Sequence, residues 1–215
     1  MTEQNLTGKD ILLLLLYLPG KTGEVNEPID GRTRLTKMIY IFDEEIKDNF
    51  DNLDKGSVPN FIPYDFGPFS RDLFDDLQFF INIEFIKEDE IDIELNNVKL
   101  NEEDYDEYKH NISEEIGYGE IDEEAIDREA TLYSYKLTEK GCKYVENNIL
   151  NNITSDQKKL LIRFKKKINS LTLDSLISYV YNKYPEDTKK SKIRNDYISE
   201  EGVDYDWEWN GSRLL

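Results

Sequence analysis

Residues 67–81, GPFSRDLFDDLQFFI, contain the signals that decide the fold. Gly67 and Pro68 form a turn, and Ser70 stands where it caps the helix that follows. The residues that predict a buried helix face are Leu73, Phe74, Leu77, Phe80 and Ile81. Their spacing of three and four residues is that of one side of a helix. The stretch therefore predicts a rigid turn that leads into a capped amphipathic helix.

The opposite side of this helix carries the candidate partner-binding residues. They are Asp72, Asp75, Asp76 and Phe79. Phe79 has two interpretations, an aromatic residue at the edge of the core or an anchor for a protein partner. In an ordinary winged-helix transcription factor this helix enters the major groove, where three aspartates would meet phosphates of like charge. DNA binding through this face is therefore disfavoured.

Two further helices are expected before this stretch. Thr7 is placed to cap an apolar helix that ends at Leu18, before Pro19-Gly20. The second helix is predicted by a stripe formed by Leu35, Met38, Ile39, Phe42 and Ile46. Arg34 and Lys37 fall on its other side. With Arg32 they are candidates for contact with nucleic acid.

A β-hairpin is expected after the capped helix. Residues 83–86 and 91–95 are β-rich, and 132–137 is a plausible return strand. An insertion at about 101–129 interrupts the pair and has a net charge of −11. Such a segment is typical of a solvated loop, and the alternative is a regulatory arm that competes with DNA or docks on a basic partner.

The motif Leu-Thr-Glu-Lys-Gly at 137–141 predicts the start of a further helix, with Cys142 on its apolar side. Two amphipathic helices follow residue 150, and residues 155–194 have a net charge of +7. The candidate nucleic-acid contacts there are Lys158, Lys159, Arg163, Lys166 and Lys167. These cations either neutralise the acidic part of the molecule or form a patch that contacts phosphates.

The order of these elements predicts an α+β, mostly helical fold with two parts. Residues 1–150 form a winged-helix-like domain, and residues 151–215 form a helical lobe with a tryptophan-containing tail. Trp207 and Trp209 show neither helical nor strand periodicity, so that tail is either a docking peptide or a strap on the core. The apolar stripe from Leu173 to Tyr184 suits either a homodimer contact or packing within the chain.

Composition excludes several classes of protein. There are 46 Asp and Glu against 27 Lys and Arg, for a net charge of −19, while 38% apolar residues suffice for a core. The longest apolar run is too short for a membrane span, and we expect a cytoplasmic protein. His110 and Cys142 are the only residues of their types. Catalytic Ser-His or Cys-His pairs, metal sites and cofactors are therefore not expected, and the chain reads as a non-enzyme.

Two motifs resemble a known family. Residues 31–40, GRTRLTKMIY, followed by residues 64–73, YDFGPFSRDL, are similar to the SocA-like antitoxins, whose domain is called Panacea, and to related uncharacterised prokaryotic proteins. The resemblance covers roughly residues 7–150 and implies a non-catalytic module that recognises proteins, as an antitoxin or proteolytic adaptor, in toxin or phage-defence loci. The acidic insertion and the helical lobe depart from the family.

The sequence leaves three candidate functions. The favoured one is a protein-interaction module whose acidic helix binds a basic partner, a toxin or a client. The alternative is a winged-helix transcriptional regulator that touches the DNA backbone through its basic residues. The third, an inhibitor that mimics DNA, follows from the net charge alone.

Overall fold

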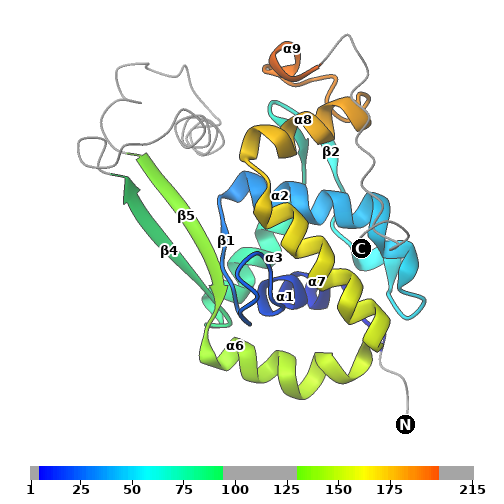
Figure 1. The fold of residues 1–215 in the computed structure, drawn as a ribbon, viewed down its shortest axis with the longest axis vertical. Coiled ribbons are helices and arrows are strands. Elements are labelled where there is room, and N and C mark those ends of the chain that lie inside the picture. Colours follow the sequence, from blue (N-terminus) through cyan, green and yellow to red (C-terminus); the bar gives the residue numbers. More distant parts are fainter. Residues whose placement is uncertain (1–4, 94–129, 199–215) are drawn as a thin grey trace.

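The computed structural model describes residues 5–93 and 130–198 and has an α+β, mostly helical fold (Figure 1). Its first part contains α1 (Gly8–Tyr17), α2 (Arg32–Ile41), α3 (Arg71–Asn82) and α6 (Glu139–Tyr144). The predicted insertion and the tryptophan-containing tail lie outside the described residues. No helix within the described ranges is long and apolar enough to cross a membrane.

The larger sheet is antiparallel and has three strands. These are β1 (Ile29–Asp30), β4 (Ile86–Ile93) and β5 (Ala130–Leu137), in the order β1-β5-β4. The predicted pairing with the return strand is confirmed, with Ile86 opposite Leu137 and Ile93 opposite Ala130, but β4 is one continuous strand and residues 83–85 form the turn before it. Apart from a short hairpin between α2 and α3, the chain order α1, β1, α2, α3, β4, β5 matches the order expected for a winged-helix-like domain. Sequence reasoning missed β1 because two residues are too few to show a strand period.

The helix starts follow from the predicted caps. Thr7 and Asp10 form a capping box at α1, and the Ser70 hydroxyl accepts a hydrogen bond from the backbone N–H of Leu73. Thr138 caps α6 in the same way, through the N–H of Gly141. Each hydroxyl satisfies a backbone donor that has no partner within its own helix. The capped helix starts at Ser70 and Thr138 are therefore confirmed.

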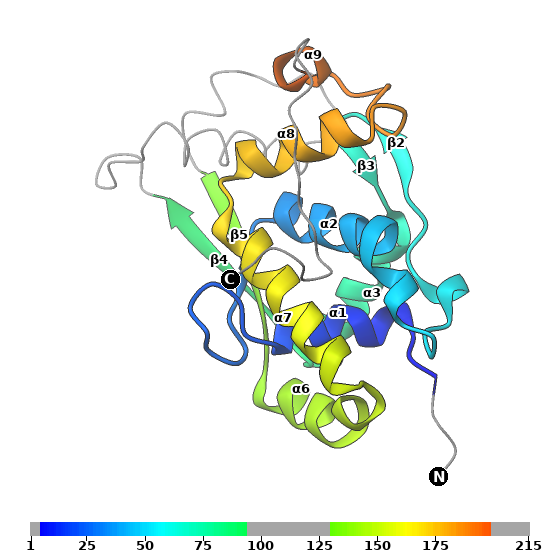
Figure 2. The ribbon, with the colours of Figure 1, turned by 45° about the vertical axis from the view of Figure 1, so that its right-hand side comes forward.

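The helical lobe packs on the first part of the chain. It consists of α7 (Ser155–Ser170), α8 (Leu173–Lys183) and the short α9 (Arg194–Tyr197). Figures 1 and 2 show α7 running across α1 and α2, with α8 beside α2. Apolar residues of α7 and α8 join the same core as α1. The stripe that begins at Leu173 is buried against α2 within the chain.

Helix α2 lies at the centre of this arrangement. Every residue from Thr33 to Ile41 is buried, and a π-helical turn, Phe42–Ile46, extends the helix. A small hairpin of β2 (Ile62–Tyr64) and β3 (Gly67–Phe69) packs beside α2 and leads into α3. This central position removes the solvent-exposed side that the amphipathic pattern predicts for α2.

Candidate protein-interaction surface

A buried lysine fixes the turn that precedes α3. Lys37 is 1% exposed, and its Nζ donates hydrogen bonds to the carbonyl oxygens of Phe66 (2.9 Å) and Pro68 (3.3 Å). Gly67 between them has φ +91°, and a Cβ there would lie 3.0 Å from the Tyr181 ring. The positive φ and the close contact favour glycine at this position. The turn is thereby held in one position, which sets where α3 begins.

Helix α3 has one buried and one exposed side. Leu73, Leu77 and Phe80 are buried, as the apolar spacing predicts. The exposed residues of this helix include Asp72, Asp75 and Phe79, whereas Asp76 is partly buried and forms an ion pair with Lys9. We call Asp72, Asp75, Asp76 and Phe79 the acidic face. The structure brings all four predicted partner-binding residues together on one helix surface.

Phe79 is 49% exposed, and it stands at one end of a row of aromatic rings. Its ring lies edge-on to that of Phe80, with centroids 5.3 Å apart. Phe80 stacks on Phe85 at 6.1 Å, and Phe85 lies 4.8 Å from Tyr144 on α6. Tyr144 is 37% exposed. We call Phe79, Phe80, Phe85 and Tyr144 the aromatic row. Phe80 packs against the Phe79 ring, and the two residues at the ends of the row, Phe79 and Tyr144, are exposed to solvent.

The charges of the acidic face differ in their surroundings. Lys9 pairs with Asp76, so the negative charge of this residue is partly neutralised. Asp72 accepts a 3.4 Å hydrogen bond from the backbone N–H of Asn60 and lies in the first turn of α3, where the helix dipole favours an anion. Asp75 lies one helical turn before Phe79 and is exposed. The face therefore combines carboxylates with an exposed ring, which suits a basic, partly apolar partner.

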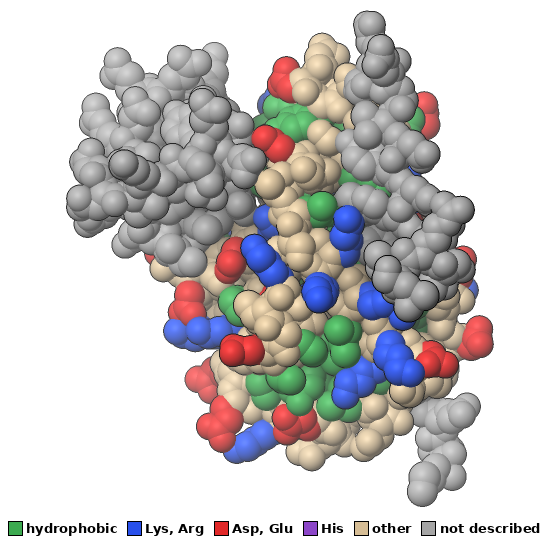
Figure 3. Space-filling view, viewed as in Figure 1, with side chains coloured by type: hydrophobic (Ala, Val, Ile, Leu, Met, Phe, Trp, Pro, Cys, Tyr) green, Lys and Arg blue, Asp and Glu red, His purple; other side chains and the backbone are tan. Residues whose placement is uncertain are grey.

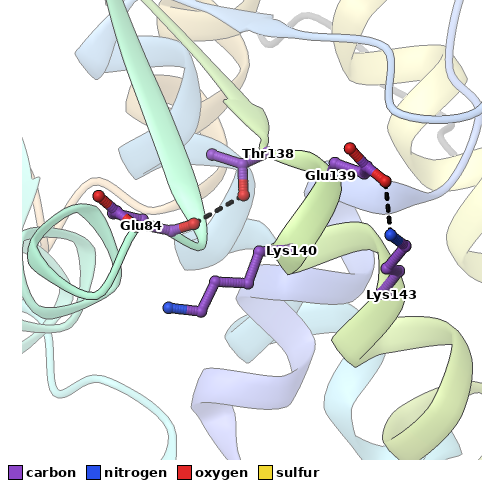
Figure 4. A pocket seen from close by; sticks show the side chains of 5 residues that line it. All are labelled: Glu84, Thr138, Glu139, Lys140 and Lys143. Atoms are coloured by element: carbon purple, nitrogen blue, oxygen red, sulfur yellow. Dashed lines mark hydrogen bonds and ion pairs between the residues drawn. The ribbon is translucent and has the colours of Figure 1, made fainter.

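An open pocket lies beside the aromatic row (Figure 4). Its lining consists of Glu84, Thr138, Glu139, Lys140 and Lys143. The Thr138 hydroxyl donates to the carbonyl of Glu84 (2.6 Å), and Glu139 pairs with Lys143. The Nζ of Lys140 donates to the carbonyl of Ile83 (2.8 Å) and lies 5.4 Å from the centre of the Phe85 ring. These contacts hold the turn between α3 and β4 to the start of α6 and assemble no catalytic pair.

A second charged surface covers α7. The five predicted nucleic-acid contacts on this helix, Lys158, Lys159, Arg163, Lys166 and Lys167, are all exposed. We call them the basic stripe. In Figure 3 Lys and Arg side chains gather on the face toward the viewer, where α7 runs in Figure 1. Asp156 pairs with Lys159 at 3.4 Å.

The structure corrects the assignment of Arg34 and Lys37 to a nucleic-acid surface. Arg34 is buried, and its Nη1 donates to the carbonyls of Ile168 and Leu171, both at 2.8 Å, where α7 ends. Lys37 is buried at the turn before α3. Neither side chain can reach a phosphate, because α7, α8 and the β2–β3 hairpin pack against α2.

Arg32 is partly buried at the sheet. Its Nε donates to the Tyr135 hydroxyl (3.0 Å), its Nη2 lies 3.5 Å from Glu88, and its guanidinium stacks 4.1 Å from the centre of the Tyr133 ring. These contacts hold the start of α2 against β4 and β5. They give Arg32 a structural role and leave the basic stripe as the exposed part of the predicted nucleic-acid surface.

Sequence reasoning missed a buried ionic cluster between α1 and α7. The Nζ of Lys165, a fully buried residue, donates to the carbonyls of Leu16 (3.1 Å), Leu18 (2.7 Å) and Glu27 (2.7 Å). The pKa of Lys165 is lowered to about 7, because the effect of burial exceeds the opposite effect of the nearby Glu27 charge. The signal was present in the sequence, because Lys165 falls on the same side of α7 as Leu161 and Ile168.

The Glu27 carboxylate organises the loop after α1. It accepts hydrogen bonds from the backbone N–H of Lys21 (2.8 Å) and of Thr22 (2.6 Å), from the Thr22 hydroxyl, and from the Asn169 side chain (2.7 Å). Burial raises its pKa, yet the hydrogen bonds from Thr22, Asn169 and Lys21 outweigh burial and lower the pKa to about 2. Because these donors bind the loop and the carbonyls within the fold, the cluster stabilises the packing of α7 on α1 and the loop after it.

Groups that could carry chemistry are few in the described part of the chain. Cys142 is partly buried beside the core, and burial raises the pKa of its thiol. Residues 5–93 and 130–198 contain no group of three or more His, Cys, Asp or Glu side chains placed to hold a metal ion. Comparison with protein-family models, curated proteins and solved structures finds no match for this chain.

Proposed function

We propose that this chain is a non-catalytic protein-interaction module that binds a basic partner through the acidic face of α3. One observation carries the proposal: the helix that would read DNA in a winged-helix regulator presents carboxylates and a half-exposed Phe79 instead. The negative charges repel phosphates and attract a basic surface, and the ring supplies an apolar anchor. The resemblance to SocA-like antitoxins supports a toxin or a client protein as partner.

A pull-down with paired variants tests this proposal. The bait is the full chain in native extract, and recovered protein and nucleic acid are quantified separately. In the test variant, Asp75→Lys is combined with Phe79→Ala, which reverses one exposed charge and removes the exposed ring. We expect the wild-type bait to recover a basic protein and the variant to lose it, because hot-spot anchors account for most of the binding energy.

The control variant combines Glu24→Lys with Ile62→Ala. Glu24 is exposed, and Ile62 is 49% exposed like Phe79, so the control makes the same kinds of change away from α3. We expect it to recover the partner as well as the wild type does. Equal recovery by the test variant and the control would contradict the assignment of the binding surface to α3.

A second candidate function is favoured by the basic stripe. Five exposed cations on one helix suit the phosphate backbone of nucleic acid, and such contacts give affinity with little sequence specificity. In this alternative the chain is a DNA-binding regulator that uses α7 instead of α3. We expect binding of a random-sequence duplex to fall steeply as salt is raised. A Lys159→Glu/Lys166→Glu variant should no longer bind the duplex. If the wild type shows no measurable binding at low salt, this function is excluded.

A further inference from the structure

The chain leaves the described structure beside α8, the helix that follows the basic stripe. The Tyr197 hydroxyl donates to Asp174 (2.7 Å) in the first turn of α8, and the Tyr197 carbonyl accepts from the Asn182 side chain (2.8 Å). The Tyr197 ring also lies 5.6 Å from that of Tyr181. Helix α8 begins directly after α7. Residue 198 is thus held beside the helix that follows the stripe.

The residues that follow have the composition that the stripe would attract. The segment 199–215 contains five acidic residues, all between 200 and 208, against one arginine. It also contains both tryptophans of the chain, at positions 207 and 209. Aromatic rings bind well over Lys and Arg side chains, whose charges they attract through the ring face. Acidic and aromatic groups therefore alternate in a segment tethered near a basic helix.

The segment after residue 198 is long enough to cover the basic stripe. The stripe from Lys158 to Lys167 is about 14 Å long at the helical rise per residue. Residues 199–208 can extend over about 33 Å. On α7, Lys159, Ile162, Arg163 and Lys166 share one side by their spacing, and partly buried Ile162 adds an apolar contact between the cations. The extended length of the segment therefore exceeds the length of the stripe by more than a factor of two.

We propose that residues 199–215 bind in cis along the basic stripe of α7, as an internal competitor for any polyanion that would bind there. The acidic residues from 200 to 208 pair with the exposed lysines, and Trp207 and Trp209 lie over the cations and Ile162. Docking neutralises the most basic surface of an otherwise acidic molecule. It also assigns the role of competitor to this segment instead of the acidic insertion at 101–129.

Tryptophan fluorescence of the full chain tests this directly, because Trp207 and Trp209 are the only tryptophans. We expect both to be protected from acrylamide at low salt compared with the urea-unfolded chain. Raising the salt concentration should remove protection by screening. The variant Lys159→Glu/Lys166→Glu should show the same loss of protection and a red-shifted emission, with an unchanged far-ultraviolet circular dichroism spectrum.

The variant Lys21→Glu/Arg71→Glu is the matched control, since it reverses two exposed cations outside α7. We expect its tryptophans to stay as protected as those of the wild type. Tryptophans in the wild type that are as accessible as in the unfolded chain would overturn the proposal. So would a stripe variant that behaves like the control. Protection that increases with protein concentration would place the segment on a second copy and overturn binding in cis.

Discussion

At the scale of single residues, three buried cations connect elements of the fold by binding backbone carbonyls. Arg34 holds the end of α7, Lys37 holds the turn before α3, and Lys165 holds the end of α1. The last carbonyls of a helix have no N–H donor within that helix and carry partial negative charge, which applies to the carbonyls of Ile168 and Leu16 that Arg34 and Lys165 bind. A buried cation there recovers part of the free energy that its desolvation costs. These residues orient the acidic face and the basic stripe indirectly.

Removing Lys37 should destabilise the protein strongly. In Lys37→Ala the carbonyls of Phe66 and Pro68 lose the ammonium donor and the buried side chain leaves a cavity, so we expect a loss of about 3 kcal/mol in the free energy of unfolding. Lys166→Ala on exposed α7 is the control and should change it by less than about 0.5 kcal/mol. Urea unfolding measures both. Equal small effects would contradict the buried position of Lys37.

Glu27 should make stability depend on pH in the acid range. Its pKa is lowered to about 2 in the folded state, so the folded protein binds its proton less readily than the unfolded chain does. The stabilisation is fully present above the unfolded pKa of about 4.3 and is lost as pH falls toward 2. We expect Glu27→Gln to reduce the free energy of unfolding by about 2 kcal/mol at pH 7 and to have little further effect near pH 2.

Urea unfolding of wild type and Glu27→Gln at several pH values measures this difference. The control is Glu24→Gln, since Glu24 is an exposed acid in the same loop. We expect the control to track the wild type at every pH. A difference between Glu27→Gln and wild type that stays constant from pH 7 to pH 2 would show that lost packing, and not the charge, is responsible.

At the scale of elements, the exit from β5 depends on a close approach between α6 and the turn before β4. A Cβ at Gly141 would lie 2.2 Å from the carbonyl oxygen of Phe85, which is backbone and cannot rotate away. The N–H of Thr138 donates to the same carbonyl at 3.0 Å. Only glycine lets α6 pack this closely on the turn before β4. Two residues of the Leu-Thr-Glu-Lys-Gly motif are thus explained: Thr138 caps α6, and Gly141 permits the close contact with Phe85.

Gly141→Ala should therefore separate α6 from the turn before β4. We expect a loss of about 2 kcal/mol or more in the free energy of unfolding, as for other overpacked sites. Gly56→Ala is the control, because a Cβ there meets only Asp54 Oδ1 at 3.4 Å, and its effect should be small. Thermal unfolding compares the two. Similar midpoints for both variants would contradict the close approach at Gly141.

The predicted elements near the acidic face could be read from local chemistry. Ser70 caps α3, and the apolar spacing along that helix leaves Asp75 and Phe79 exposed, as the pattern predicts. Local rules sufficed here because one side of α3 faces solvent. They failed on α2, where helices from the far end of the chain cover the side that carries Arg34 and Lys37.

At the scale of the whole molecule, the helical lobe and the first part of the chain share one core. Phe164 is fully buried, and helix α7 packs on α1 and α2. The predicted boundary at residue 150 stays a prediction, but the shared core implies that the two parts unfold together. Cooperative unfolding is the usual behaviour of residues that share one core.

Phe164→Ala tests this coupling. We expect it to lower the free energy of unfolding by about 3 to 5 kcal/mol and to shift one single transition. Far-ultraviolet and near-ultraviolet circular dichroism should report the same midpoint, because tyrosines occur in both parts of the chain. Exposed Arg163→Ala is the control and should leave the midpoint nearly unchanged. Two separate transitions would show instead that the lobe is an independent unit.

The sequence by itself determined the fold class, the helix starts at Thr7, Ser70 and Thr138, and the two exposed charged surfaces. Caps, helical periodicity and strand alternation act over a few residues, so their physical causes lie within the segment that shows them. Only the tertiary structure decided that Arg34, Lys37 and Lys165 are buried and that β1 completes the sheet. Those outcomes depend on contacts between segments far apart in the chain, and burial of a cation is stable only where such contacts supply its acceptors.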